Sequence, residues 1–315
     1  MSKPEVLVAA NVWPRYMQML QEHFSVHDRL HQTDPAAFAA AAPRIRAVAA
    51  SGEAKVSREL IAQMPALELI SVFGVGYDGV DVAAAKERGV PVTHTPDVLT
   101  DEVADLALAL MLNVARRVPQ ADRFVRAGLW PAGAFPLTRK VSGARLGIVG
   151  LGRIGLAIAK RGQALGMSIA YTSRTAKADV PHRYFPSAQA LAGEVDFLVA
   201  ITPGGAGTRK LINAEVLRAL GPKGYFINVA RGSVADEAAL IEALQNGVIA
   251  GAGLDVYENE PHVPEALMKL DNVVLTPHMA SGTVQTRQAM ADLALVNLTE
   301  HFAGRPVRTL VPEMK

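Results

Sequence analysis

A glycine-rich turn between two apolar stretches is the feature of this chain that most constrains its fold. An apolar stretch over residues 146–149 runs into Gly150, Gly152 and Gly155, which have the spacing G-x-G-x-x-G. A helical stretch follows, and then a second apolar stretch that ends at Tyr171. Strand, glycine turn, helix and strand, in that order, form the context in which this fingerprint indicates dinucleotide binding. The glycines permit a tight turn, close approach of the backbone to a pyrophosphate, and packing of the helix on the strand.

The end of the second strand indicates which nicotinamide cofactor is bound. NAD-dependent proteins usually carry Asp or Glu about 20 residues beyond the glycines, where it bonds the ribose 2′-hydroxyl. This chain has Ser173, Arg174 and Thr175 there and no acid. A guanidinium is always charged and forks onto phosphate oxygens, and the two hydroxyls can donate further hydrogen bonds. We therefore predict NADPH as the preferred cofactor and NADH as the alternative, in which Arg174 is only a solvated loop residue.

Composition excludes several other classes of protein. The 315 residues suffice for two domains, and half of them are hydrophobic. With 32 basic and 30 acidic side chains and no basic block, neither nucleic acid nor a membrane is expected as a partner. The absence of cysteine excludes disulfides and thiolate chemistry, and no metal is predicted. The first residues enter a strand directly, and the longest apolar run, Leu106–Ala115, is too short to span a bilayer, so we expect a cytoplasmic protein.

Short apolar strands alternate with helical stretches along most of the chain, which predicts parallel βαβ units. The expected strands cover residues 6–10, 47–51, 69–75, 90–93, 146–150, 167–171, 197–201, 225–229, 250–256 and 273–275. The expected helices cover residues 14–23, 35–42, 57–63, 81–88, 101–115, 119–128, 156–165 and 284–302.

The position of the fingerprint predicts two domains. Such a motif normally opens a nucleotide-binding domain, yet here a complete α/β unit precedes it. We predict two Rossmann-like doubly wound parallel-sheet domains with the active site in the cleft between them. Residues 1–98 plus 286–315 would form the substrate-binding domain, and 99–285 the dinucleotide-binding domain. The last helix, Val284–Phe302, has no strand after it and is expected to pack on the N-terminal domain.

A second feature is the apolar helix expected over Asp101–Ala115. It is hydrophobic on nearly all sides after its first turn and must be buried, either in an intrachain core or against another subunit. Thr100 is its expected N-cap, with Asp101 and Glu102 complementing the helix dipole. We predict a homodimer in which a partner covers this helix.

Three ionisable residues follow strand ends in the second half of the chain. Arg231 comes after the strand at 225–229, Glu260 after the strand at 250–256, and His278 after the strand at 273–275. Each alone has an ordinary explanation, as a solvated turn, a surface carboxylate or a structural histidine. Ligands of open α/β sheets bind at the carboxyl ends of the strands, so the three side chains are expected together beside the nicotinamide.

Taken together, these motifs resemble the D-isomer-specific 2-hydroxyacid dehydrogenases along essentially the whole chain. The Tyr171–Thr175 segment is similar to that of the NADPH-using glyoxylate and hydroxypyruvate reductase branch, which includes plant hydroxyphenylpyruvate reductases. The motifs that carry the resemblance are Val72–Asp78, Thr100–Asp105, Gly150–Gly155, Asn228–Gly232, Gly253–Pro261 and Thr276–His278.

The resemblance implies a role for each matching residue. Arg231 would hold the 2-keto acid through its carboxylate and carbonyl oxygen, His278 would donate the proton in reduction, and Glu260 would pair with His278. A carboxylate beside histidine stabilises imidazolium, and an alkoxide formed by hydride transfer needs a proton and a nearby positive charge. Backbone N–H groups of Val75 and Gly76 would bind the substrate carboxylate, together with Arg231 and His278. Cofactor contacts are implied for Thr100, Gly150, Leu151, Gly152, Arg153, Ile154, Gly155, Ser173, Arg174, Thr175, Val229, Ala230, Asp255 and Ser281.

We therefore predict NADPH-dependent reduction of small 2-keto acids, such as glyoxylate or hydroxypyruvate, to D-2-hydroxy acids. Reduction of larger keto acids such as hydroxyphenylpyruvate is the first alternative. A phosphoglycerate dehydrogenase would be expected to have an acid after Tyr171, and a formate dehydrogenase an amide at Glu260. A dinucleotide-sensing corepressor is the alternative from another class. Met279 departs from the small residue usual in the family, and Trp130 is expected either to reach a neighbouring active site or to anchor the core.

Overall fold

A computed structural model of the chain describes residues 3–52 and 54–315, and it divides into two compact units. Unit 1 comprises Met1–Leu99 and Ser281–Lys315, and unit 2 comprises Thr100–Ala280. Each unit is an α/β fold built on a parallel sheet, as the alternating pattern predicts. None of the helices in the described residues is long and apolar enough to cross a membrane.

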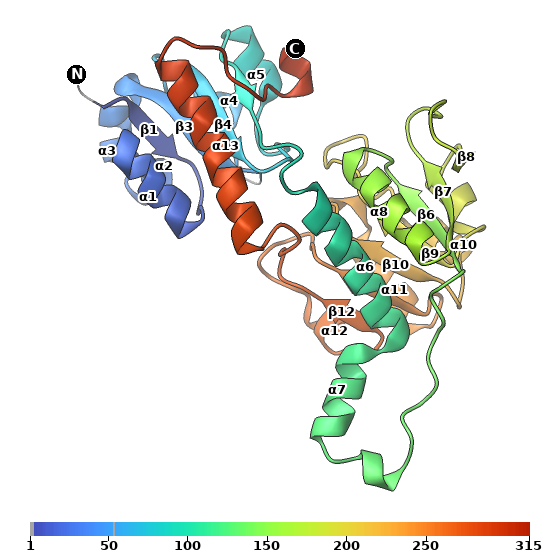
Figure 1. Cartoon of the computed structure of the whole chain (residues 1–315). Coiled ribbons are helices and arrows are strands. Elements are labelled where there is room, and N and C mark those ends of the chain that lie inside the picture. The colour runs from blue at the N-terminus through green and yellow to red at the C-terminus, as the bar shows by residue number, and fades with distance from the viewer. Residues whose placement is uncertain (1–2, 53) are drawn as a thin grey trace. The chain divides into compact units, whose positions relative to one another are not determined.

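The sheet of unit 1 has five strands in the order β2-β1-β3-β4-β5, all parallel (Figure 1). The neighbouring strands β3 and β4 are mostly apolar and mostly buried, which is typical of a parallel sheet covered on both faces. The strands are β1 (Glu5–Val8), β2 (Ser25–Asp28), β3 (Ile45–Ser51), β4 (Leu69–Phe73) and β5 (Val92–Thr93).

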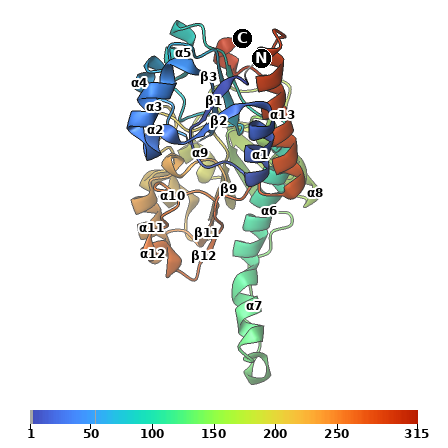
Figure 2. The same cartoon turned by 90° about the vertical axis from the view of Figure 1, so that its left-hand side faces the viewer.

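Helices cover both faces of this sheet. Figure 2 shows α1 and α13 on one face and α2, α3, α4 and α5 on the other. Helix α13 (Val284–Phe302) contacts β4 and α1, which confirms that the last helix returns to the N-terminal part of the chain. The other helices are α1 (Pro14–His23), α2 (Leu30–Thr33), α3 (Pro35–Ala41), α4 (Arg58–Ala62) and α5 (Val82–Glu87), with short 3₁₀ turns at Ala42–Arg44 and Pro312–Met314.

The sheet of unit 2 has seven parallel strands in the order β12-β11-β10-β9-β6-β7-β8. From β6 the chain proceeds outward through β7 and β8, then returns to β9 on the other side of β6. Ligands of such sheets bind where the strand order reverses. The strands are β6 (Arg145–Val149), β7 (Ser168–Thr172), β8 (Arg183–Phe185), β9 (Phe197–Ala200), β10 (Tyr225–Asn228), β11 (Gly251–Leu254) and β12 (Val273–Leu275).

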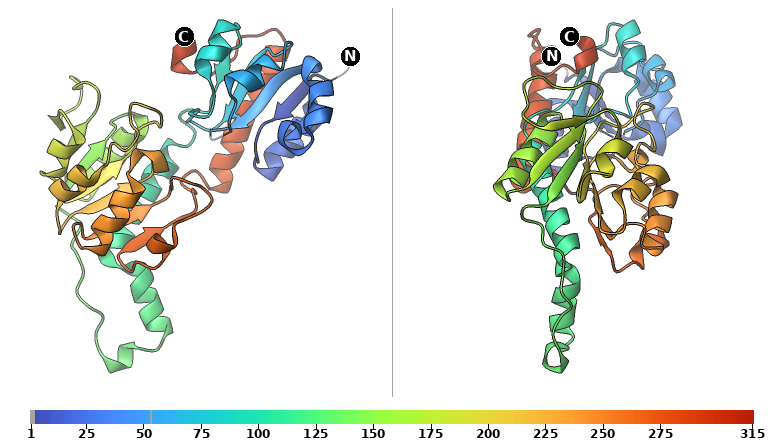
Figure 3. Two further views of the ribbon diagram at one scale, coloured as in Figure 1. Left: turned by 180° about the vertical axis from the view of Figure 1, so that it is seen from behind. Right: turned by 90° about the vertical axis from the view of Figure 1, so that its right-hand side faces the viewer.

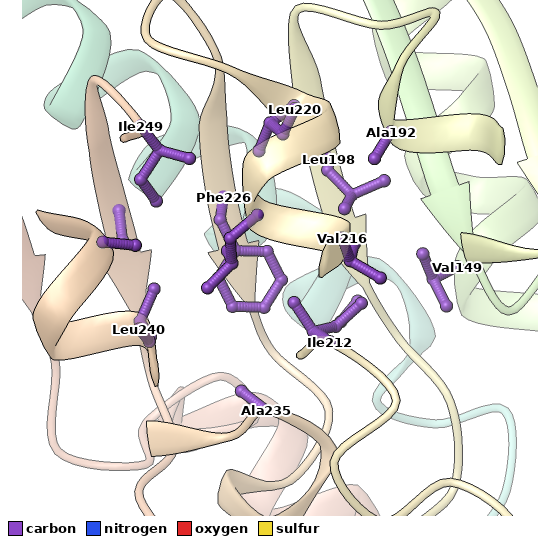
Figure 4. Close-up of a cluster of buried hydrophobic side chains, with 14 of the residues drawn as sticks. Val149, Ala192, Leu198, Ile212, Val216, Leu220, Phe226, Ala235, Leu240 and Ile249 are labelled. Atoms are coloured by element: carbon purple, nitrogen blue, oxygen red, sulfur yellow. The ribbon is translucent and has the colours of Figure 1, made fainter. Parts of the chain in front are cut away.

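Two helical layers enclose this second sheet. Helices α6 (Thr100–Arg116) and α8 (Arg153–Ala164) pack on one face. The other face carries the buried cluster drawn in Figure 4, in which Phe226 packs among Leu198, Ile212 and Val216. The helices on that side are α9 (Ala188–Ala192), α10 (Ala214–Leu220), α11 (Glu237–Gln245) and α12 (Glu265–Met268).

Most apolar side chains of helix α6 are buried within its own unit, while Leu112 is 36% exposed, and cover of the helix by a partner subunit stays a prediction. The helix contacts α8, β10 and β11, and a side chain at Gly253 of β11 would come within 2.9 Å of Leu110 of the helix. The glycine therefore lets the helix lie close to the sheet. The helix begins at Thr100, which places this residue in the first turn rather than at the N-cap.

An arm extends from the end of α6. It consists of α7 (Val118–Arg126), a 3₁₀ turn at Trp130–Ala132 and the segment that leads back to β6, and it is drawn in green in Figure 3. Asp271 anchors its base through Arg117 and Arg123, at 2.7 and 2.9 Å. Farther out, several large apolar side chains are exposed.

Two strands, β2 and β8, are not predicted by the hydrophobic pattern. Both lie at sheet edges, where a strand needs no continuous apolar sequence because much of it faces solvent. The expected strand at 69–75 ends at Phe73, so Val75 lies in the following loop.

Candidate active site

The predicted catalytic residues all lie at one edge of the unit 2 sheet. Because the strands are parallel, the segments after β6, β10, β11 and β12 emerge at the same carboxyl edge. These segments carry the glycine turn, Arg231, Glu260 and His278 respectively. The edge is also the point at which the strand order reverses, where ligands of open α/β sheets bind.

His278 and Glu260 form an ion pair. Nδ1 of the imidazole lies 2.6 Å from Oε2 of the carboxylate. The second carboxylate oxygen of Glu260 accepts the backbone N–H of Tyr257 at 2.9 Å, so the acid is held from two sides. An ionised carboxylate can only accept, which leaves Nδ1 as the donor and Nε2 as the nitrogen able to exchange a proton with a substrate.

Asp255 holds the turn that presents His278. Its carboxylate accepts hydrogen bonds from the Thr276 hydroxyl at 2.6 Å and from the N–H groups of Met279 and Ala280, both at 2.9 Å. Burial raises the pKa of Asp255, and these three donors oppose that shift by stabilising the carboxylate. His278 itself has a left-handed backbone with φ 49°, a conformation that the surrounding hydrogen bonds must impose on a residue other than glycine.

Arg231 is presented by a tight loop after β10. The buried Asn228 fixes this loop, since its amide donates to Arg231 O at 3.0 Å and accepts the N–H of Ala230 at 3.1 Å. Gly232 permits the loop to lie against the next one, because a Cβ there would lie 1.9 Å from the backbone of Tyr257. The arginine and glutamate loops are therefore packed backbone to backbone.

The glycine turn has the geometry that a dinucleotide requires. Gly150 has φ 103°, and a Cβ there would meet Ile201 O at 2.7 Å. A Cβ on Gly155 would meet Gly150 O at 2.3 Å, so the start of α8 packs directly on the turn. Gly152, by contrast, faces open space, and no side chain caps α8. The N-terminus of this twelve-residue helix thus fits a pyrophosphate.

The remaining predicted cofactor residues lie in several different segments of the chain. Arg153 and Ile154 begin α8, and Leu151 is buried beneath the turn. Ser173, Arg174 and Thr175 follow β7, with Arg174 exposed and the Ser173 hydroxyl donating to Thr175 O at 2.7 Å. The buried Val229 and Ala230 precede Arg231, Thr100 begins α6, and Ser281 is assigned to unit 1.

Val75 and Gly76, predicted to bind the substrate carboxylate, lie in unit 1 in the loop that follows β4. Sequence reasoning assigned no role to Asn228, Gly232 or Thr276, although all three lie within the motifs that carry the resemblance. Their signal is a polar or glycine residue at or shortly after the end of a strand, where the following loop must be ordered or closely packed. The described residues contain no group of His, Asp and Glu able to hold a metal.

Comparison with known proteins agrees with this geometry. Residues 108–280 match the D-isomer specific 2-hydroxyacid dehydrogenase, NAD binding domain. A hydroxyphenylpyruvate reductase of Plectranthus scutellarioides is 52% identical over 270 residues, 86% of each chain. A glyoxylate/hydroxypyruvate reductase of Arabidopsis thaliana is 51% identical over 267 residues, 85% of each chain.

The fold comparison covers both units. The crystal structure of an NADPH-dependent glyoxylate/hydroxypyruvate reductase from Sinorhizobium meliloti, in complex with NADP and malonate, is similar with a TM-score of 0.93 and 50% identity. The match covers 99% of this chain and 98% of that one. On sequence and structure together, this protein belongs to the D-isomer specific 2-hydroxyacid dehydrogenases.

Proposed function

We propose that the protein reduces small 2-keto acids, glyoxylate and hydroxypyruvate above all, to D-2-hydroxy acids with NADPH. The observation that carries this proposal is the 2.6 Å His278–Glu260 pair at the same sheet edge as the glycine turn. Relatives named as glyoxylate/hydroxypyruvate reductases support the choice of substrate. In this proposal unit 2 binds the dinucleotide, and residues 1–98 plus 286–315 form the substrate-binding domain.

The reaction assigns a task to each residue of the site. When bound, the reduced dinucleotide supplies the hydride. Arg231 holds the planar keto acid and offsets negative charge that develops on its carbonyl oxygen. His278 delivers a proton from Nε2 to that oxygen, and Glu260 stabilises the imidazolium before the transfer. The N–H groups of Val75 and Gly76 bind the substrate carboxylate.

The preference for NADPH rests on the segment after β7. Arg174 is exposed, follows a strand end that carries no acid, and has hydroxyl groups on either side. That combination suits a 2′-phosphate. The NADP-bound relative supports the same choice.

Hydroxyphenylpyruvate is the second candidate substrate, because a reductase of that compound is 52% identical to this chain. The two candidates differ by an aromatic ring, so the measurement is kcat/KM with NADPH for glyoxylate, hydroxypyruvate and hydroxyphenylpyruvate. A higher kcat/KM for glyoxylate and hydroxypyruvate supports the proposal. The reversed order would instead make hydroxyphenylpyruvate the proposed substrate. Oxidation of NADPH with none of them would refute it. Met279, whose side chain is 45% exposed beside His278, is the first position to vary if the order is reversed.

We further propose that the arm pairs with a second copy of the chain. Leu137 is fully exposed, and Leu112, Val118 and Phe135 line a hollow beside it. Trp130 is 67% exposed on the same arm, which disfavours its role as a core anchor. A large apolar patch of this kind marks an interaction surface. Cytoplasmic location stays a prediction.

Sedimentation velocity at micromolar concentration tests the dimer. The wild-type protein should sediment as a dimer, and Leu137→Asp should shift it toward the 33.4 kDa monomer. Val284→Asp is the matched control, because Val284 is also exposed but begins α13 and is no part of the arm. A monomeric wild type, or dissociation by both variants alike, would rule out the arm as the interface.

A further inference from the structure

The loop proposed to bind the substrate carboxylate is fixed from one side by a neighbouring segment. Two consecutive carbonyl groups of the loop are hydrogen-bonded to two consecutive residues. The backbone N–H of Thr95 donates to Gly74 O at 2.8 Å, and Nδ1 of His94 lies 2.9 Å from Val75 O. A carbonyl oxygen can only accept, so Nδ1 of His94 carries the hydrogen.

These two bonds determine where the loop's N–H groups point. In a trans peptide the N–H lies opposite the C=O of the same plane. The Val75 N–H shares its plane with Gly74 O, and the Gly76 N–H shares its plane with Val75 O. Both N–H groups therefore face away from the 94–95 segment. In residues 3–52 and 54–315 neither of them donates a hydrogen bond to a backbone carbonyl group. Successive N–H groups that point together form an anion-binding concavity.

The Val75–Gly76 plane needs such a restraint more than an ordinary peptide does. Gly76 has no Cβ, so its backbone reorients at little steric cost, and Gly74 gives the preceding peptide plane the same freedom. A rotation of the plane would turn the Gly76 N–H away from its neighbour and replace it with a carbonyl oxygen, which repels a carboxylate. The imidazole of His94 is the side-chain donor that opposes this rotation.

His94 is itself rigidly held. Its side chain is buried, with the residue 7% exposed, and the Tyr77 ring packs edge-on against it with centroids 5.4 Å apart. Its backbone is bound on both sides by Thr309, from His94 N to Thr309 O at 3.1 Å and from the Thr309 hydroxyl to His94 O at 2.6 Å. The C-terminal segment thus fixes the histidine, and the histidine fixes the loop.

We propose that His94 is a positioning residue for the 2-keto acid: its Nδ1–H holds the Val75–Gly76 peptide so that two N–H groups converge on the substrate carboxylate. The proposal rests on the proposed function, which places the carboxylate at this loop. Because the carboxylate is bound alike in the ground state and the transition state, loss of the restraint should raise KM and leave kcat in place.

Three substitutions at position 94 separate this role from others. His94→Asn places an amide N–H where Nδ1 was, His94→Gln places it where Nε2 was, and His94→Leu removes the donor. We expect His94→Leu and His94→Gln to raise KM for glyoxylate by about tenfold with kcat changed by less than about twofold, and His94→Asn to stay near the wild type. His23→Leu is the matched control, since His23 makes the same kind of bond, Nδ1 to Met19 O at 2.9 Å, elsewhere in unit 1.

Several outcomes would overturn the proposal. An unchanged KM in His94→Leu, or an equal rise in His23→Leu, would show that the bond does not matter to the substrate. Damage in His94→Asn equal to that in His94→Leu would show that the ring acts through its charge or its other nitrogen. If His94→Leu does not fold, the pair His94→Asn and His94→Gln decides the question.

Calorimetric titration of the NADPH-bound protein with oxalate separates this proposal from the proposed function. Oxalate carries the two adjacent carboxylates but is not reduced, so its dissociation constant requires no turnover. Weaker binding to His94→Leu supports the positioning role even if no keto acid is reduced. Equal binding to both proteins, or no binding to either, refutes the role even if reductase activity is found.

Discussion

Two histidines of this protein use the same ring nitrogen for opposite purposes. His278 in unit 2 directs Nδ1 to the carboxylate of Glu260 at 2.6 Å, and its side chain is 36% exposed. His94 in unit 1 directs Nδ1 to a backbone carbonyl, Val75 O, at 2.9 Å, and the residue is buried. A carboxylate stabilises the charged ring and thereby makes it a proton donor. A neutral carbonyl only fixes the ring, so His94 is suited to hold a peptide and His278 to carry out acid–base chemistry.

The backbone surroundings of the two histidines also differ. His278 lies on a turn with left-handed backbone that Asp255 ties down through three hydrogen bonds. His94 lies next to a strand of the sheet and is bound through its backbone to Thr309. In the proposed roles, the partner of Nδ1, and not the presence of a histidine near a sheet edge, separates a proton donor from a positioning residue.

The largest effect is expected from His278→Ala. Removal of the proton donor should lower kcat for reduction by about a hundredfold to ten-thousandfold, because a positioned general acid contributes that much. The dissociation constant for NADPH, measured by fluorescence titration, should change little. His94→Leu should instead leave kcat in place, so the two variants separate kcat from KM. Near-normal turnover in His278→Ala would show that His278 is not the proton donor, and the proposed difference in role between His278 and His94 would be wrong.

A substitution in the proposed cofactor site serves as a reference, because neither histidine is proposed to bind the 2′-phosphate. Arg174→Ala should raise KM for NADPH by about tenfold to a hundredfold, since a charge-assisted bond to the 2′-phosphate is lost. KM for NADH and for the keto acid should hardly change. Lys160→Ala, which removes an exposed positive charge from α8, is the matched control. An equal loss for both cofactors would mean that Arg174 does not contact the 2′-phosphate.

The sequence predicted the central strands of both sheets and the common sheet edge of Arg231, Glu260 and His278, because both depend on local, repeated signals. Buried parallel strands read as apolar runs, and strand ends place polar residues at one edge. The edge strands β2 and β8 carry no such run, so their pairing depends on neighbours that the sequence does not identify. The packing of α6 on its own sheet was left open for a similar reason, because the sequence does not show that Gly251 and Gly253 allow the helix to lie close to the strands.

His94 was not predicted at all, for a physical reason. Its role depends on a hydrogen bond to Val75, nineteen residues earlier, and on Thr309 near the end of the chain. No spacing rule connects these positions, because the connection is made by strand pairing between β4 and β5 and by the path of the C-terminal segment. His278 was predicted because it directly follows a strand in a recognisable motif, whereas His94 looks like an ordinary loop residue.

A smaller effect is expected from Glu260→Gln, which removes the charge that distinguishes His278 from His94. Reduction uses the protonated imidazole, whose population falls as pH rises. Since the carboxylate 2.6 Å away favours that form, its loss should move the alkaline limb of the kcat/KM profile to lower pH. The acid plateau should be largely kept. In His94→Leu the alkaline limb should not move. An unshifted limb in Glu260→Gln would show that the Glu260 carboxylate does not stabilise the protonated His278.

The smallest effect is expected at Tyr77, whose ring supports His94. Its hydroxyl donates to the Glu313 carboxylate at 2.9 Å, and burial followed by that charge raises the pKa of Tyr77, so the hydroxyl stays protonated over the working pH range. Tyr77→Phe keeps the ring against the imidazole and loses only this bond at a surface carboxylate, which contributes about 1 kcal/mol or less to the free energy of unfolding. KM for glyoxylate should therefore rise by less than about threefold, with kcat unchanged. Tyr77→Leu, which removes the ring, should approach the KM of His94→Leu. If Tyr77→Phe were as damaging as Tyr77→Leu, the hydroxyl and the C-terminal segment, rather than the ring, would fix His94.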